Sequence, residues 1–256
     1  MYPTILKFGD IVISSYSVMV LIAYMVGYIL LEKEIVRRGY NAKIADICLI
    51  ATLIGGLGGA KILFILQQAT WTDFINDPIR YFASGYTFLG GFAGSFLMLI
   101  LVSKIRKINF WSISDAICPS VVIAYGIGRI GCLLVGDDYG IPSNLPWAIS
   151  FPKGSPPIDI PVHPTQIYDT IFMSILFLIL WKIRKRVYPP GWLASVGFSL
   201  LAVERFFIEF IRETSPSFIQ GISQAQIMSL ALIAIFIARL IYIFMKYGQK
   251  IQQKPN

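Results

Sequence analysis

The sequence contains few charged residues for its length. Asp, Glu, Lys and Arg together make up 14% of the 256 residues, whereas hydrophobic residues make up 56%. A soluble domain of ordinary composition has about 25% charged residues, so this scarcity excludes a soluble globular protein. The mean hydropathy of +0.68 points the same way. The composition therefore predicts a polytopic membrane protein.

Cysteine and histidine are also scarce. Cys48, Cys118 and Cys132 lie in apolar stretches without the spacing of metal ligands, so neither a disulfide framework nor a zinc site is expected. His163 is the single histidine, and it lies between prolines, where a structural role competes with a catalytic one. The sequence has no Ser-His-Asp signature, P-loop or HExxH motif, and no metal or cofactor is expected. Any chemistry must rest on arginine, tyrosine, histidine and carboxylates.

Long apolar segments predict the fold. About 20 apolar residues are needed to cross the hydrocarbon core of a bilayer. Seven segments fit that template, and no soluble domain fits between them. We therefore expect an all-α protein with seven transmembrane helices that forms a single integral membrane domain over residues 1–256. The segments are 14–32, 45–66, 87–103, 111–135, 165–182, 191–212 and 224–245.

The basic residues predict the orientation. Lys and Arg are concentrated after the first, third and fifth segments and in the C-terminal tail, whereas the opposite side holds Lys7, Arg80, Lys153 and little else. Because short cytoplasmic loops carry the excess of basic residues, we expect the N-terminus outside and the C-terminus in the cytoplasm. The opening MYPTILKFGD lacks the basic region and cleavage site of a removable signal peptide. The first segment itself is therefore expected to direct insertion.

Ionisable residues interrupt the apolar segments. Arg129 lies inside the fourth segment, where an unpaired cation is costly. Arg205, Glu209 and Arg212 follow one another at i, i+4 and i+7 in the sixth, so we expect them on one helical face in its outer half. Lys61 is expected at the same depth in the second segment. These positions predict that charged groups from several helices converge in the outer leaflet.

Two interpretations of this convergence remain open. The first is an ion-paired triad of Arg205, Glu209 and Arg212 that locks helices together. The second is that the arginines hold an anion that the protein itself does not supply. The cations outnumber the acids that we assign to this depth, Glu204 and Glu209, which favours the second interpretation. A lipid phosphate is the anion that a membrane supplies, and arginine grips phosphate with two parallel hydrogen bonds. Snorkelling to the interface is a further explanation for Lys61 and Arg212.

Several fragments occur in a fixed order along the chain. They are GGAKILF, TFLGG, ISDAICP, GIGRIGCLLVGDDYG, VHPTQIYD, ERFFIEFIRE and SQAQIMSL. Together they resemble bacterial phosphatidylglycerol–prolipoprotein diacylglyceryl transferases nearly from end to end. Members of that family transfer diacylglycerol from phosphatidylglycerol to the lipobox cysteine thiol of a prolipoprotein and release glycerol phosphate. The resemblance implies this step of lipoprotein maturation, in the bacterial plasma membrane, at a site that faces the outer leaflet.

The resemblance also implies roles for particular residues. Arg129 and Arg205 match the family's two essential arginines, and Tyr16 matches a tyrosine of its first span. These three are the expected catalytic residues: the arginines hold the lipid phosphate, and Tyr16 orients the lipid or the thiol. The residues expected to contact the substrates are Lys61, Asp137, Gly140, His163, Gln166, Tyr168, Glu209 and Arg212.

Some positions depart from the family pattern. Leu89 stands where a third-span histidine has been proposed as a base, and Cys132 and Val135 replace two asparagines of the arginine signature. Asp169 replaces a glutamate. These departures leave two alternatives open, namely a related lipid-headgroup transferase with another acceptor and a non-catalytic phospholipid-binding paralogue. An anion transporter is disfavoured, because the charges lie toward one face rather than at the midplane.

Overall fold

The structure, a computed structural model, describes residues 2–8, 11–68, 71–83, 85–212 and 221–251. The chain divides into two compact units. The first unit comprises Met1–Leu31 and Ser114–Asn256, and the second comprises Glu32–Ile113. A single membrane domain over residues 1–256 stays a prediction.

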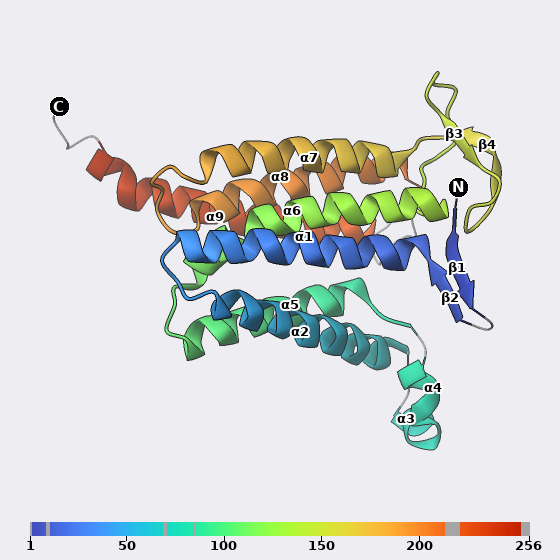
Figure 1. Cartoon of the computed structure of the whole chain (residues 1–256), viewed down its shortest axis with the longest axis horizontal. Helices are drawn as coiled ribbons and strands as arrows, with labels where there is room; N and C mark the ends of the chain where they lie inside the picture. Colours follow the sequence, from blue (N-terminus) through green and yellow to red (C-terminus); the bar gives the residue numbers. More distant parts are fainter. Residues whose placement is uncertain (1, 9–10, 69–70, 84, 213–220, 252–256) are drawn as a thin grey trace. The chain divides into compact units, whose positions relative to one another are not determined.

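The elements of the first unit are mostly helices (Figure 1). They are β1 (Thr4–Phe8), β2 (Ile11–Ser14), α1 (Ser15–Arg37), α6 (Phe110–Val135), β3 (Ile149–Phe151), β4 (Ile158–Val162), α7 (Thr165–Ile183), α8 (Trp192–Ile208), the 3-10 turn η1 (Glu209–Ile211) and α9 (Gln224–Ile251). The boundaries between the units fall within α1 and α6. The second unit holds α2 (Lys43–Gln68), α3 (Trp71–Asn76), α4 (Pro78–Ala83) and α5 (Phe88–Ile105).

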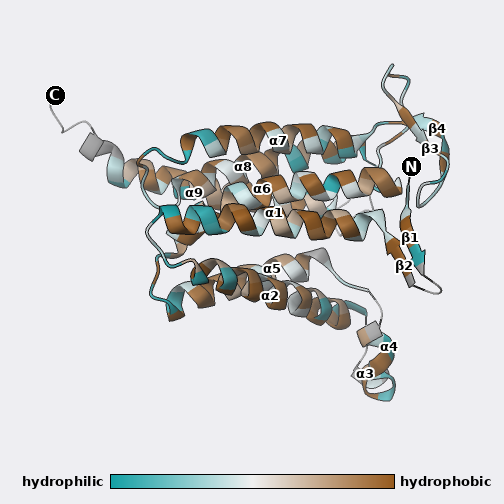
Figure 2. Ribbon diagram, in the orientation of Figure 1, coloured by the Kyte–Doolittle hydropathy of each residue, from teal (hydrophilic) through white to brown (hydrophobic). Residues whose placement is uncertain are grey.

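A helix lies at each of the seven segments that the sequence predicts to be apolar spans. Five of these helices, α1, α2, α6, α7 and α9, are long and apolar enough to cross a membrane, and α5 is a shorter apolar helix. Figure 2 shows hydrophobic residues along the lengths of these helices. Many of their large apolar side chains face outward; Phe244 on α9, for example, is 78% exposed. A surface of this kind belongs in lipid, and the chain is an all-α polytopic membrane protein in its main architecture.

The sixth expected segment ends earlier than predicted. The sequence predicts one helix through residue 212, whereas α8 ends at Ile208 and Glu209 begins a 3-10 turn. Arg212 has an extended backbone, with φ −109° and ψ 148°. The expectation that Arg205, Glu209 and Arg212 share one helical face is therefore wrong for Arg212. The backbone of Arg212 leaves the helix because it pairs as a β-bridge with Gly140.

Two small antiparallel sheets, which the sequence analysis does not predict, lie at one end of the first unit (Figure 1). β1 pairs with β2 in a hairpin before α1, and β3 pairs with β4 in the long connection between α6 and α7. The two ends of that connection are joined by a backbone hydrogen bond, in which the His163 amide donates to the carbonyl of Ile141 at 3.1 Å. The residues between α6 and α7 thus form an ordered cap rather than an open loop.

The core of the first unit lies where α6, α7 and α8 meet. Its buried members are Cys118, Val122, Met173, Leu176, Leu180, Leu193 and Ala194. The buried carboxylate of Asp115 on α6 accepts hydrogen bonds from the backbone amides of Gly191 and Ala194, both at 2.8 Å. These amides lie at the start of α8 and have no partner inside that helix. Asp115 therefore caps α8 from a neighbouring helix and sets the register between α6 and α8.

In the second unit, α2 packs along α5 through glycine. A Cβ atom at Gly59 would collide with the backbone carbonyl of Gly90, and one at Gly94 would collide with the carbonyl of Gly55. A side-chain hydrogen bond also joins the two helices, because the Ser95 hydroxyl on α5 donates to the backbone carbonyl of Thr52 on α2 at 3.0 Å. Small residues allow membrane helices to approach this closely.

Gly59→Ala is expected to destabilise the protein, while the neighbouring Gly58→Ala is not. A methyl group at Gly59 meets backbone that can move only if the helices separate, at a cost of about 1–3 kcal/mol. No atom of another helix lies within 4 Å of a Cβ built at Gly58, so there the higher helix propensity of alanine, up to about 1 kcal/mol, acts alone. Thermal unfolding of the two purified variants in the same detergent measures the difference. Equal melting temperatures would show that the α2–α5 approach is not tight.

Candidate functional site

A glycine turn ends α6 and returns the chain toward Arg129. Gly136 has φ +76°, and its amide donates to the carbonyl of Cys132 at 2.8 Å. Glycine adopts this left-handed conformation without a Cβ penalty. The chain reverses after the turn, and Asp138 consequently comes back beside Arg129.

Arg129 is buried between two carboxylates. Its side chain is 6% exposed, and its Nη1 donates to Asp138 Oδ2 at 2.9 Å. On the other side its Nε forms an ion pair with Asp169, whose side chain is fully buried near the start of α7. The cost of placing a cation in this segment is thus offset within the protein.

Arg212 reaches the same acidic residue. Its Nη2 lies 2.7 Å from Asp138 Oδ1, so the two oxygens of one carboxylate bridge Arg212 and Arg129. The backbone of Arg212 is held by its bridge to Gly140, and the preceding Ile211 carbonyl accepts from the Ile141 amide at 2.9 Å. The segment after α8 therefore docks on the segment after α6.

Arg205 pairs with an acid on its own chain segment. Its Nη2 lies 2.9 Å from Glu209 Oε2, and the Glu209 side chain is 4% exposed. The Nη1 of Arg205 is buried and has no hydrogen-bond partner among the described residues. Arg205 therefore keeps a donor that its own ion pair does not use.

Arg129 and Arg205 belong to one electrostatic cluster. The phenol of Tyr125 on α6 and the carboxyl of Glu204 on α8 each interact with both arginines. Glu204 also interacts electrostatically with Asp169. Both arginines are therefore within electrostatic range of the same two side chains, and their joint role in holding an anion stays a prediction.

Tyr16 and Asp137 lie around this cluster. Tyr16, at the start of α1, packs against Gly131 of α6 and interacts electrostatically with Arg129 and Asp137. Asp137 is half-buried beside the Cys132 thiol, and burial raises the pKa of its carboxyl above the usual value. Both predicted residues are therefore in the same part of the first unit as Arg129.

The first turn of α7 holds the loop rather than facing outward. The Gln166 side chain is fully buried, and its amide donates to the carbonyl of Asp137 at 2.5 Å. The hydroxyl of Thr165 donates to the carbonyl of Asp138 at 2.8 Å. Gln166, selected for substrate contact, thus supports the backbone beneath Asp137 and Asp138, and Thr165, which the sequence analysis does not select, does the same.

His163 and Tyr168 form a polar cluster with Trp147. The phenol oxygen of Tyr168 lies 3.3 Å from His163 Nδ1 and accepts from Trp147 Nε1 at 2.8 Å. The carbonyl of His163 accepts from the Gly140 amide at 2.8 Å. A Cβ at Gly140 would collide with the Ile211 carbonyl and with His163, so this close approach requires glycine. Gly140 thus lies between two chain segments: its amide donates to His163, and it pairs as a β-bridge with Arg212, whose backbone it positions.

Lys61 and Leu89 belong to the second unit. The Lys61 ammonium donates to the carbonyl of Gly85 at 2.8 Å and lies 4.0 Å from the ring centroid of Tyr86. These contacts tie α2 to the connection before α5. Leu89, near the start of α5, is 44% exposed. The structure does not place either residue relative to Arg129, and a role for Lys61 at the substrate stays a prediction.

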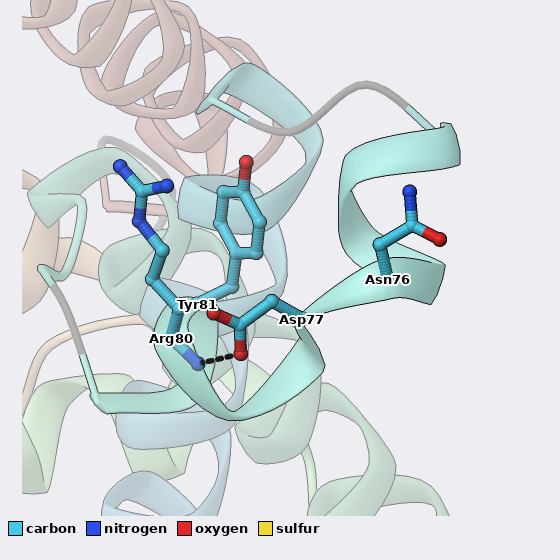
Figure 3. Close-up of a pocket in the computed structure, with 4 residues that line it drawn as sticks. All are labelled: Asn76, Asp77, Arg80 and Tyr81. Atoms are coloured by element: carbon cyan, nitrogen blue, oxygen red, sulfur yellow. Dashed lines mark hydrogen bonds between the residues drawn. The ribbon is translucent and has the colours of Figure 1, made fainter.

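A separate hollow of 420 Å³ lies at α3 and α4, lined by Asn76, Asp77, Arg80 and Tyr81 (Figure 3). Within it the Asp77 carboxylate caps α4 by accepting from the Arg80 amide at 3.1 Å. The lining contains one acid and one base and has no net charge. It offers no excess charge to hold an ion.

One group of potential metal ligands occurs among the described residues. Cys132, Asp137 and Asp138 bring one ligand atom each within 4.8 Å of one another. Both oxygens of Asp138 already accept from arginines, and adjacent guanidinium groups repel a cation. The donor set therefore suits an anion-binding cluster better than a metal.

Two acidic partners were missed in the sequence analysis. The expected surplus of cations over acids is wrong in the first unit, because Asp138 and Asp169 neutralise the arginines along with Glu209. A signal was available for Asp169, which occupies the outer end of the fifth segment at the depth expected for Arg129. Nothing in the sequence pattern distinguishes Asp138 from a solvated loop acid.

Comparison with known proteins shows the family of this chain. Residues 3–242 match the model of the family described as prolipoprotein diacylglyceryl transferase. The phosphatidylglycerol–prolipoprotein diacylglyceryl transferase of Clostridium tetani is 33% identical over 92% of this chain and 95% of its own length. The enzyme of that name from Mannheimia succiniciproducens is 32% identical over 90% of this chain and 88% of its own length. The chain belongs to the prolipoprotein diacylglyceryl transferase family.

Proposed function

We propose that this protein transfers the diacylglyceryl group of phosphatidylglycerol to the lipobox cysteine thiol of prolipoproteins and releases glycerol phosphate. The observation that carries the proposal is the carboxylate of Asp138 held between the buried guanidinium groups of Arg129 and Arg212, with Arg129 and Arg205 both acting electrostatically on Glu204. Membership of the family names the two substrates. The cluster supplies a physical reason why this chain binds an anionic lipid.

Unused donors support an anion site. Arg205 Nη1 and Arg212 Nε are buried and have no hydrogen-bond partner among the described residues. Leaving a buried neutral donor unpaired costs about 1–3 kcal/mol, and a charged donor costs more. The oxygens of a phosphate satisfy such donors, and guanidinium groups match their geometry. A lipid phosphate at the cluster therefore restores hydrogen bonds that the protein alone does not make.

The arginines then serve the reaction electrostatically. The sulfur of the peptide thiolate forms a C–S bond to the diacylglyceryl carbon while the bond from that carbon to the phosphate oxygen breaks. Glycerol phosphate leaves with the electron pair, and the thiol proton passes to water. Arg129 and Arg205 hold the phosphate and stabilise its growing negative charge, as fixed donors do in a water-poor site. Their positive field also favours the thiolate, which is the attacking form.

The remaining predicted residues either orient the substrates or support the groups that bind them. Tyr16 and Asp137, beside Arg129, are placed to orient the lipid or the thiol. Glu209 holds the guanidinium of Arg205 in position, and Arg212 adds a second guanidinium at the carboxylate that pairs with Arg129. Gly140, His163, Gln166 and Tyr168 act through the cap that supports residues 137–141.

We also propose that all seven apolar helices cross the membrane. The N-terminus then lies outside, the C-terminus lies in the cytoplasm and the arginine cluster faces the outer leaflet of the bacterial plasma membrane. The distribution of basic residues supports this orientation. Lipid enters laterally from the bilayer, and glycerol phosphate leaves to the outer aqueous side.

A two-label assay tests the function. The purified full-length protein is incubated with phosphatidylglycerol labelled in its headgroup and with a lipobox peptide. We expect labelled glycerol phosphate in solution and a peptide heavier by one diacylglyceryl group, and a Cys→Ser lipobox peptide serves as control. Headgroup release with another acceptor would identify a different transferase, and lipid binding without release would identify a non-catalytic paralogue. Either result contradicts the proposal.

A further inference from the structure

The carboxylate of Asp138 occupies the position that an anion takes between two arginines. Its Oδ2 accepts from Arg129 Nη1 at 2.9 Å, and its Oδ1 lies 2.7 Å from Arg212 Nη2. Two oxygens of one anionic group thus engage two guanidinium groups from separate chain segments. Two oxygens of a phosphate make the same kind of contact.

Exposure distinguishes Asp138 from the other acids of the cluster. Its side chain is 49% exposed, whereas the side chains of Arg129 and Arg212 are 6% and 9% exposed. Asp169 and Glu209, the other acidic partners, are almost fully buried. Asp138 therefore lies on the exposed side of the arginines, and an anion arriving from that side meets its carboxylate first.

A hydrogen bond holds the backbone of Asp138 in place, while each oxygen of its carboxylate contacts a single arginine. The Asp138 carbonyl accepts from Thr165 at 2.8 Å. Its φ of +58° is in the left-handed region, which aspartate and asparagine tolerate better than most residues. Rotation about the side-chain torsions therefore removes the carboxylate from the arginines without moving the loop.

We propose that Asp138 is a resident anion that competes with the ligand's phosphate for Arg129 and Arg212 and thereby selects against the doubly charged product. This inference rests on the proposed function, because that function supplies the two ligands compared. Substrate phosphodiester displaces the carboxylate when it binds, and the carboxylate returns when glycerol phosphate leaves.

The selection follows from charge. Once displaced, Asp138 is no longer neutralised by the arginines and repels the bound anion. The phosphodiester of phosphatidylglycerol carries one negative charge, whereas a phosphate monoester carries about −1.5 to −2 at pH 7. Because Coulomb repulsion grows with the charge of the ligand, Asp138 weakens product binding more than substrate binding.

Asp138→Asn tests the inference by direct binding. The asparagine keeps the shape and the left-handed backbone but removes the charge. We measure the affinity of the full-length protein in detergent for glycerol phosphate and for short-chain phosphatidylglycerol. We expect the dissociation constant for glycerol phosphate to fall by about tenfold or more, as removal of a competing charge-assisted bond implies. The constant for phosphatidylglycerol falls by a smaller factor.

Asp159→Asn is the matched control, because Asp159 is an exposed acid of β4 in the same unit. It is expected to leave both constants unchanged. Asp138→Gly is a second variant that also suits the left-handed backbone, and it is expected to behave like Asp138→Asn. Weaker or unchanged glycerol phosphate binding in both Asp138 variants overturns the inference. Tighter product binding in a protein that transfers no diacylglyceryl would support the inference and contradict the proposed function.

Discussion

Arg129→Lys is expected to lower the rate of diacylglyceryl transfer by about 10²–10³-fold, as loss of one fixed donor to a developing oxyanion does. The guanidinium of Arg129 uses separate nitrogens for Asp138 and Asp169. A lysine ammonium is a single point charge on a flexible stem and cannot hold Asp169 and a second anion in fixed directions. Conservation of charge alone is therefore not sufficient for activity.

The rate is measured with purified protein, labelled phosphatidylglycerol and a lipobox peptide under single-turnover conditions. Arg186→Lys is the matched control, since Arg186 is an exposed residue after α7, and it is expected to retain the rate of the unchanged protein. Membrane insertion and melting temperature of both variants report whether the fold is intact. Full activity in a correctly inserted Arg129→Lys protein would contradict the electrostatic mechanism.

The main architecture was predictable because the bilayer restricts it strongly. Only helices and closed barrels satisfy all backbone hydrogen bonds in hydrocarbon, so apolar length alone locates the helices. Arg129 was predictable for the same reason, since a cation in such a helix requires a partner. The apolar segments 45–66 and 111–135 were located to within a few residues of α2 and α6.

The partners of the arginines were harder to predict because they depend on chain reversal outside the helices. Asp138 reaches Arg129 only because Gly136 turns the chain, and Arg212 reaches Asp138 only because its backbone pairs with Gly140. Helical periodicity carries no information about either event. It placed Arg212 on the face of Arg205, whereas tertiary pairing ends α8 four residues earlier.

Asp169→Leu is expected to destabilise the protein by about 3–5 kcal/mol, the usual effect of breaking a buried ion pair. The leucine leaves Arg129 buried with Asp138 as its remaining acid, and Asp138 is shared with Arg212. Thermal unfolding in detergent measures the loss, and Asp159→Leu controls for replacing an acid by leucine at an exposed position in the same unit. An unchanged melting temperature for Asp169→Leu would show that the Arg129–Asp169 pair does not hold α6 to α7.

The double variant Arg129→Met/Asp169→Leu separates a structural role of this pair from a functional one. Replacing both members of a buried pair by apolar residues is often neutral or stabilising, so the double variant is expected to melt well above Asp169→Leu. The double variant is expected to transfer no diacylglyceryl, because the guanidinium of Arg129 is no longer there to bind the phosphate. Recovery of both stability and transfer would mean that the pair only locks helices together. Recovery of stability alone places Arg129 in catalysis and leaves Asp169 as the group that positions it.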